Sequence, residues 1–99
     1  NINTLYTSGL IEHLRRELSN PAIVVFGSFA KGEDTETSDI DLYIETPSNK
    51  QVRLEEFQKL LKRKIQVFRH KNIREIPNPH LANNIINGIT LNNYIDVFP

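Results

Sequence analysis

A five-residue apolar run, Ala22 to Phe26, restricts the fold of this chain more than any other feature, and it ends at a glycine. The run is short, unbroken and contains β-branched residues, which is typical of a strand buried on both faces of a sheet. Gly27 permits backbone angles that other residues avoid, so the chain can turn sharply directly after the strand. The sequence therefore predicts a buried strand that leads into a tight turn.

The residues after this turn predict a short helical turn, a loop and a second strand. Ser28 to Lys31 can form one helical turn that Gly32 closes, and Glu33 to Thr37 is a polar loop. From Ser38 to Glu45 the side chains alternate, as they do in a strand with one apolar face. The apolar side carries Ile40, Leu42 and Ile44, and the other side carries Asp39, Asp41 and Tyr43, with Tyr43 continuing outward.

One helix is predicted before this strand pair in the sequence and another after it. Apolar residues at helical spacing predict the first from about Thr4 to Leu18, and Ser19-Asn20-Pro21 ends it. Ser48 and Gln51 have the spacing of a capping box for the second, which extends to about Arg63. The residues that it is expected to bury are Val52, Phe57, Leu60 and Leu61.

The C-terminal third predicts a strand, a helix and a closing segment. Ile65 to Phe68 is a third strand candidate. Asn78 can cap a helix in which Pro79 takes the first position and which Gly88 ends. Ile89 to Phe98 has the extended character of a closing strand or a tail. The apolar stripe of the helix consists of Leu81, Ile85 and Ile86.

Together these elements predict one domain of the α/β (α+β) class over residues 1–99, of which 38% are apolar. The 12 basic and 12 acidic residues cancel, which argues against a global electrostatic attraction to nucleic acid. Without cysteine the chain has neither a disulfide framework nor a thiolate zinc site. No apolar run reaches the ~20 residues that cross a bilayer, so we expect a cytoplasmic protein without a membrane partner. The chain starts at Asn1 and lacks methionine, so we expect an initiator residue or a longer leader before it.

The two aspartates predict a metal site. Asp39 and Asp41 are alternate residues of one strand, so their carboxylates lie roughly 6–7 Å apart on the same side. Two ionised carboxylates this close repel each other, and a divalent cation removes the repulsion. Mg²⁺ characteristically binds one or two carboxylates and fills its other positions with water and substrate phosphate.

The turn before the aspartates predicts an anion site. If Ser28 opens a helical turn, the free backbone amides there favour a negatively charged group, and the Ser28 hydroxyl adds a donor. Lys31 can reach a phosphate, although a lysine facing solvent is equally compatible with the sequence. An anion site beside a cation site describes a pocket for a nucleoside triphosphate and its metal.

The motif formed by residues 27–32 (GSFAKG) and 38–42 (SDIDL) resembles the signature of the DNA polymerase beta nucleotidyltransferase superfamily, and in particular its small minimal nucleotidyltransferase branch. The resemblance implies a mixed β-sheet flanked by helices. It also implies that Gly27 and Ser28 contact the triphosphate of ATP or another nucleotide and that Asp39 and Asp41 hold Mg²⁺. Such enzymes transfer a nucleoside monophosphate to an acceptor and release pyrophosphate. Small members are often paired with a helical HEPN-type protein, and some act as antitoxins that adenylylate it.

One position departs from the pattern of this family. The family places a third carboxylate on the strand after the second helix, where this chain has Gln66. An uncharged amide offsets no metal charge and accepts no proton from the acceptor. Three explanations stay open: Glu45 or Glu75 supplies the carboxylate, the enzyme is slow, or the protein binds a nucleotide or partner without turnover.

These observations predict a Mg²⁺-dependent nucleotidyltransferase, with a catalytically impaired antitoxin-like or partner-binding protein as the alternative. A domain of this size has little room to recognise an acceptor, so a HEPN-type partner or a homodimer is expected. An RNA-binding module is a third, less favoured hypothesis. It depends on a basic stretch around the third strand: Lys59, Lys62, Arg63, Lys64, Arg69, His70, Lys71 and Arg74.

Overall fold

The computed structural model describes residues 1–33 and 37–96 and contains a four-stranded sheet. The sheet has the order β3-β2-β1-β4, in which β1 is antiparallel to β2 and to β4, while β2 and β3 are parallel. It is therefore the mixed sheet that the sequence predicts. Its strands are β1 (Ala22–Phe26), β2 (Ile40–Glu45), β3 (Ile65–His70) and β4 (Ile89–Asn92).

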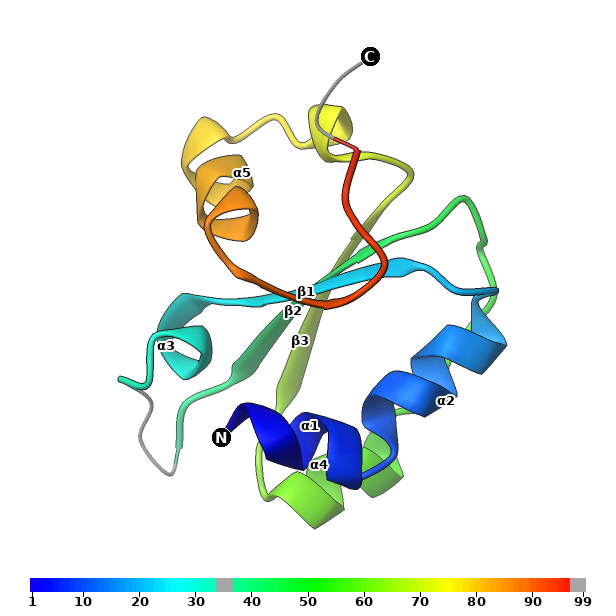
Figure 1. Ribbon diagram of the computed structural model, residues 1–99, viewed down its shortest axis with the longest axis vertical. Coiled ribbons are helices and arrows are strands. Elements are labelled where there is room, and N and C mark those ends of the chain that lie inside the picture. The colour runs from blue at the N-terminus through cyan, green and yellow to red at the C-terminus, as the bar shows by residue number, and fades with distance from the viewer. Residues whose placement is uncertain (34–36, 97–99) are drawn as a thin grey trace.

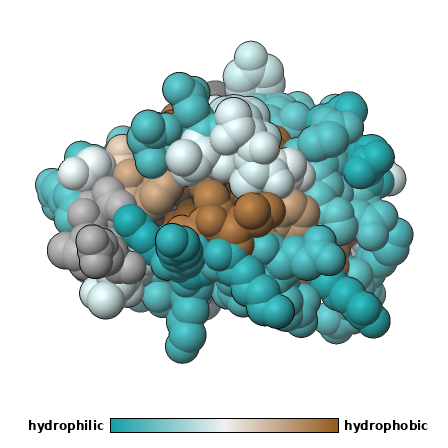
Figure 2. Space-filling view, turned by 90° about the horizontal axis from the view of Figure 1, so that it is seen from below, coloured by the Kyte–Doolittle hydropathy of each residue, from teal (hydrophilic) through white to brown (hydrophobic). Residues whose placement is uncertain are grey.

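Helices cover both faces of this sheet, and Figure 1 shows α1, α2 and α4 on one side with α5 on the other. The first layer consists of α1 (Ile2–Thr7), α2 (Leu10–Glu17) and α4 (Glu55–Leu61). The second consists of α5 (Pro79–Ile86) and the short 3₁₀ helix η1 (Ile73–Glu75). Two apolar clusters result, one on each face of the sheet. Seen from below, the molecule has apolar side chains at its centre, surrounded by hydrophilic ones (Figure 2).

The second strand is buried on both faces, which corrects the prediction that Tyr43 continues outward. Tyr43 is fully buried and packs with Val24 and Phe26 in the cluster beneath η1 and α5. Its hydroxyl donates a hydrogen bond of 2.8 Å to Oε1 of Glu45, so the polar tip keeps a partner. Burial, and then this bond, raise the pKa of Tyr43 well above its ordinary value. The alternation of side chains therefore predicted the strand correctly but did not predict that its second face is also buried.

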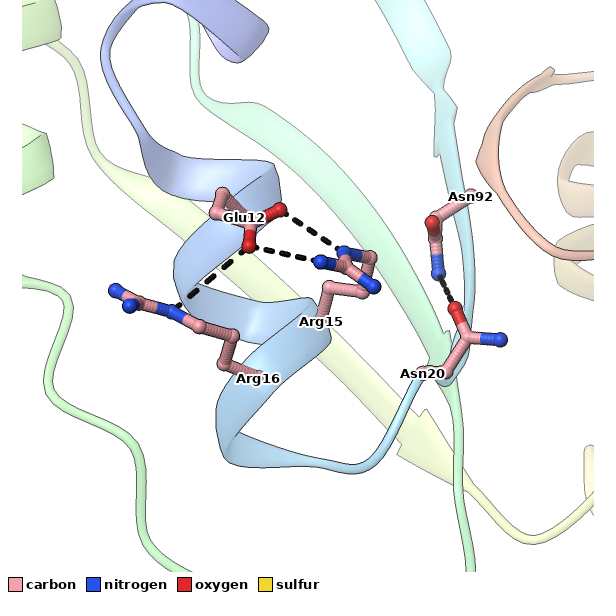
Figure 3. Close-up of polar contacts among 5 residues, drawn as sticks. All are labelled: Glu12, Arg15, Arg16, Asn20 and Asn92. Carbon is pink, nitrogen blue, oxygen red and sulfur yellow. Dashed lines mark hydrogen bonds and ion pairs between the residues drawn. The ribbon is translucent and has the colours of Figure 1, made fainter.

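The first predicted helix is two helices, because Gly9 interrupts it with a φ of +88°. This left-handed conformation favours glycine and cannot continue a right-handed helix. The apolar spacing nevertheless continues across the break, since Leu5 of α1 and Leu10 and Leu14 of α2 are all buried. On the outer surface of α2, the carboxylate of Glu12 lies between two arginines (Figure 3).

The predicted capping box at Ser48 is wrong. The Ser48 hydroxyl accepts a hydrogen bond from the Lys50 amide, and α4 begins only at Glu55. Leu60, expected to face inward, is 66% exposed, whereas Phe57 and Leu61 pack against the core. The helix is consequently shorter than the pattern predicts and buries a narrower side.

The last helix begins as predicted, and the closing strand is confirmed. The Asn78 side chain accepts hydrogen bonds from the amides of His80 and Leu81, with Pro79 in the first helical position. Ile85 is buried, but Ile86 is 48% exposed, so the predicted stripe is too wide. Residues 34–36 of the predicted polar loop and Val97 and Phe98 of the predicted tail lie outside the described residues. Within residues 1–33 and 37–96, no helix has the length and apolarity that crossing a membrane requires.

Candidate active site

The turn after β1 and the second aspartate lie in direct contact. β1 and β2 pair with Phe26 opposite Asp41, so Gly27, the next residue, lies beside the Asp41 side chain. A Cβ atom built on Gly27 would lie only 2.6 Å from Oδ2 of Asp41, closer than real Cβ atoms come to other atoms. Gly27 also has a φ of +76°. The backbone conformation therefore favours glycine here, and a larger residue would displace the Asp41 carboxylate from its position.

Asp39 and Asp41 form an electrostatically coupled pair. Asp39 is exposed and directly precedes β2, while Asp41 is partly buried. Burial raises the pKa of the Asp41 carboxyl above its ordinary value, and the negative charge of Asp39 raises it further. The described residues supply no hydrogen bond or ion pair to either carboxylate. A bound cation would compensate both the burial and the repulsion.

The predicted helical turn is present as α3 (Gly27–Ala30). Phe26 precedes it in an extended conformation and makes no side-chain cap. The turn is held by backbone hydrogen bonds from Lys31 N–H to Gly27 O at 3.2 Å, from Gly32 N–H to Phe29 O at 3.3 Å and from Glu33 N–H to Ser28 O at 3.0 Å. The first amides of such a turn have no partner within it, so they remain available to an anion. Ser28 is partly buried and Lys31 is exposed.

Gln66 stands directly beside Asp41. The parallel register of β2 and β3 pairs these two residues, so their side chains point to the same face of the sheet. Gln66 is exposed there. Gln66 is the residue that the resemblance matched to the family's third carboxylate, and the register shows that it is a neighbour of Asp41. Among residues 1–33 and 37–96, no cluster of three or more His, Cys, Asp or Glu side chains could hold a metal ion.

The two substitute carboxylates considered from the sequence lie elsewhere. Glu45 is four residues beyond Asp41 on the same strand, about 13 Å away at the usual rise per residue. Its carboxylate accepts hydrogen bonds from the Tyr43 hydroxyl and from the Asp96 amide. Glu75 accepts a hydrogen bond from the Lys71 amide. The site therefore offers a cation two carboxylates and one uncharged amide oxygen, which are all hard oxygen ligands of the kind that Mg²⁺ prefers.

Arg63 is a further residue of this site, and the sequence interpretation missed its role. Its guanidinium donates a hydrogen bond of 3.3 Å to the carbonyl oxygen of Ser38, the residue before Asp39. The same group lies 5.7 Å from the centre of the Phe29 ring on α3. Lys62 ends α4 in a left-handed conformation, with a φ of 55°. Arg63 thus connects α3 to the start of the acidic strand, a contact for which sequence spacing gave no signal.

The basic stretch that suggested RNA binding is divided in space. The basic residues from Lys59 to Lys64 precede β3, and those from Arg69 to Arg74 form its last two positions and the segment beyond, so residues 65–68 of the strand separate the two groups. Arg69 donates to the Ser48 carbonyl at 2.6 Å and Arg74 to the Asp96 carbonyl at 3.3 Å. Several of these cations therefore make contacts within the fold instead of forming one continuous strip.

Comparison with known proteins agrees with the fold and the motif. The family model described as the nucleotidyltransferase domain matches residues 8–91, which include all four strands up to Leu91 of β4. The chain therefore belongs to the nucleotidyltransferase domain family, whose activity is nucleotidyl transfer.

One curated protein is also similar to the chain. A protein of Methanocaldococcus jannaschii named "Putative protein adenylyltransferase MJ1379" is 34% identical to the chain over 71 residues. The match covers 65% of this chain and 68% of that protein. No solved structure gives a significant match.

Proposed function

We propose that this domain is a Mg²⁺-dependent nucleotidyltransferase that transfers AMP from ATP to a hydroxyl of a protein or another macromolecule. The observation that carries the proposal is the contact between the Asp41 carboxylate and the Gly27 turn. This contact places a predicted cation ligand next to a predicted phosphate ligand. The name of the Methanocaldococcus jannaschii protein supports the choice of adenylyl transfer to a protein.

In the proposed reaction, the acceptor oxygen forms a bond to the α-phosphorus of ATP. The bond from this phosphorus to the oxygen that bridges to the β-phosphate breaks, and pyrophosphate leaves with that electron pair. The acceptor proton passes to solvent, because Gln66 has no carboxylate to receive it. Mg²⁺ held by Asp39 and Asp41 would supply positive charge that offsets the phosphate charge.

The residues of the chain contribute binding and orientation. Asp39 and Asp41 would hold the cation, and Gln66 can add a neutral oxygen ligand. The amides of the turn that starts at Gly27, together with the Ser28 hydroxyl, would bind phosphate oxygens. Lys31 is exposed beside this turn and would add a positive charge.

Calorimetric titration tests this proposal. We expect ATP to bind the wild type in the presence of Mg²⁺ and to lose most of its affinity when Mg²⁺ is omitted or in the variant D39N/D41N. Transfer of labelled AMP to an acceptor should be lost in the same variant. ATP binding that is equal in the wild type and the variant would contradict the proposal.

A second candidate follows from Gln66, which stands where the family has a carboxylate. With only two carboxylates at the site, the protein would bind ATP and a HEPN-type partner while turning over slowly or not at all. The variant Gln66→Asp separates the two candidates. A large gain in AMP transfer with unchanged partner binding would favour the impaired protein, whereas efficient transfer by the wild type would favour the enzyme.

A further inference from the structure

A hollow adjoins the Gly27 turn on the side away from β3. It has a volume of about 290 Å³ and lies between α3 and the connection from α5 to β4. Among residues 1–33 and 37–96, none of those that line it is acidic. They are Phe26, Gly27, Ala30, Lys31, Asn84, Asn87, Gly88 and Ile89.

Both walls of this hollow are fixed to β1. A Cβ atom on Gly88 would lie 2.5 Å from the Val25 carbonyl oxygen and 2.7 Å from Cγ1 of Val24, so the chain after α5 packs directly on this strand. The opposite wall starts at Gly27, the residue that follows β1. The hollow is therefore formed by backbone segments that the sheet holds in place.

The hollow is continuous with the site proposed for the metal and the phosphates. Gly27 lines the hollow and also contacts the Asp41 carboxylate. A ligand whose phosphates lie between Asp41 and the turn therefore has the hollow next to it. An extended ligand, such as a nucleotide, can occupy both.

The walls of the hollow suit a nucleobase better than more phosphate. Asn84 and Asn87 are three residues apart and so lie on one side of α5, where each carboxamide offers a donor and an acceptor. Ile89 is 39% exposed and adds an apolar surface. Lys31 is the one charged residue among the described residues of the lining, and a single positive charge is too little for a polyphosphate. A few polar groups on an apolar wall are characteristic of small-molecule sites, and an asparagine carboxamide pairs well with the N6 and N7 edge of adenine.

We propose that this hollow receives the adenine base of the nucleotide, with Asn84 and Asn87 bound to the edge of the base and Ile89 packed against its face. This inference rests on the proposed function, since it assigns the other end of the same substrate. It also explains how a domain of this size could select ATP from other nucleotides without a second domain.

Titration with three probes in the presence of Mg²⁺ tests the assignment: ATP, GTP and inorganic tripolyphosphate. We expect the wild type to bind ATP more tightly than GTP. In the variant N84A/N87A the affinity for ATP should fall about tenfold or more, the preference over GTP should disappear, and tripolyphosphate should bind as before. Asn83→Ala is the matched control, because Asn83 is an exposed residue of the same helix outside the lining.

Each other result has a defined meaning. Equal wild-type affinities for ATP and GTP, or no effect of N84A/N87A on ATP, would overturn the assignment of the base. An equal loss for all three probes would assign the hollow to the phosphates instead. The variant D39N/D41N keeps the two proposals apart: if it binds neither ATP nor tripolyphosphate while N84A/N87A changes nothing, the proposed function stands and only this inference fails.

Discussion

The two ends of the sheet differ in whether their polar side chains have hydrogen-bond partners. At the site end, where β1 gives way to α3 and β2 begins, the described residues provide no hydrogen bond to the carboxylates of Asp39 and Asp41. At the opposite end, which we call the anchored end, Glu45 accepts bonds from Tyr43 and Asp96. There Asn92 also donates to the Asn20 side chain at 2.9 Å (Figure 3) and to the Pro21 carbonyl at 2.7 Å.

This contrast indicates that one end of the sheet contributes mainly to stability and the other mainly to function. Polar groups in folded proteins normally find partners, and those of the anchored end connect β2 and β4 to the adjoining loops. A partly buried carboxylate next to a second one is costly unless something else binds it. The site end therefore retains an unfavourable arrangement that a cation and a phosphate would relieve, and this is typical of functional sites.

The largest expected effect comes from Gly27→Ala. The new Cβ atom would collide with Asp41 at 2.6 Å, so ATP binding and AMP transfer should fall below detection. Gly32→Ala is the matched control, because Gly32 also has a positive φ, of 71°, but no atom of the described residues lies within 4 Å of its Cβ position. Both variants should lose roughly 1–2 kcal/mol of stability from the left-handed backbone. Titration and chemical denaturation measure both effects, and equal ATP binding by the two variants would contradict the assigned contact.

The next largest effect is expected on the unfolding free energy when the Asp41 carboxylate is removed. Because the folded-state pKa of Asp41 is raised, its ionisation destabilises the fold above that pKa and has no such effect below the ordinary carboxyl value of 3.8. Asp41→Asn should therefore raise the unfolding free energy at neutral pH, and the gain should vanish as the pH falls through this range. Mg²⁺ should stabilise the wild type but not the variant.

Thermal unfolding as a function of pH, with and without Mg²⁺, checks this prediction. A loss of stability in Asp41→Asn at neutral pH would show that the carboxylate is a structural group like those of the anchored end. Asp39→Asn serves as the comparison, since Asp39 is exposed and its removal relieves only the repulsion.

The anchored end should give the reverse result. In Glu45→Gln, the side chain keeps one oxygen acceptor but its amino group cannot accept the second hydrogen bond. We expect a loss of about 1 kcal/mol in unfolding free energy, with ATP affinity unchanged. Urea denaturation and the same titration test both parts, and a loss of ATP affinity at equal stability would remove the distinction between the two ends.

A modest effect on both stability and binding is expected at Arg63, which connects α3 and Ser38. Arg63→Ala removes the hydrogen bond to the Ser38 carbonyl and the contact with the Phe29 ring, so stability should fall by about 1–2 kcal/mol. The Mg²⁺ concentration needed for half-maximal ATP binding should rise severalfold, because Asp39 follows Ser38 directly. Lys64→Ala, an exposed neighbour, should change neither quantity. If only stability changes in Arg63→Ala, the arginine holds the fold and not the acidic pair.

Local patterns in the sequence were sufficient for the core of the motif. The apolar run fixed β1 at Ala22–Phe26, and Asn78 with Pro79 fixed the start of α5. The order of strands along the chain also followed, since period-two alternation and turn chemistry act over a few residues.

Other predictions failed where contacts between residues far apart in the chain determine which side chains are buried. Tyr43 was expected to face outward, but η1 and α5 cover it. These elements belong to the C-terminal third of the chain, and residues 38–45 contain no signal that predicts their position. Ser48 had the spacing of a helix cap, yet its loop extends to Leu54 before α4 begins. Leu60 and Ile86 had helical spacing but lie outside the buried side of their helices.

The sequence by itself therefore determined the glycine turn, the acidic strand and the family to which the chain belongs. Each depends on backbone conformations and side-chain alternation that neighbouring residues impose. Only the tertiary structure decided that Asp41 touches Gly27, that Arg63 holds Ser38, and that Asn84 and Asn87 line a hollow next to the same turn. These contacts join residues far apart in the chain, and they exist because strand pairing and the packing of helices on both faces of one sheet bring the residues together.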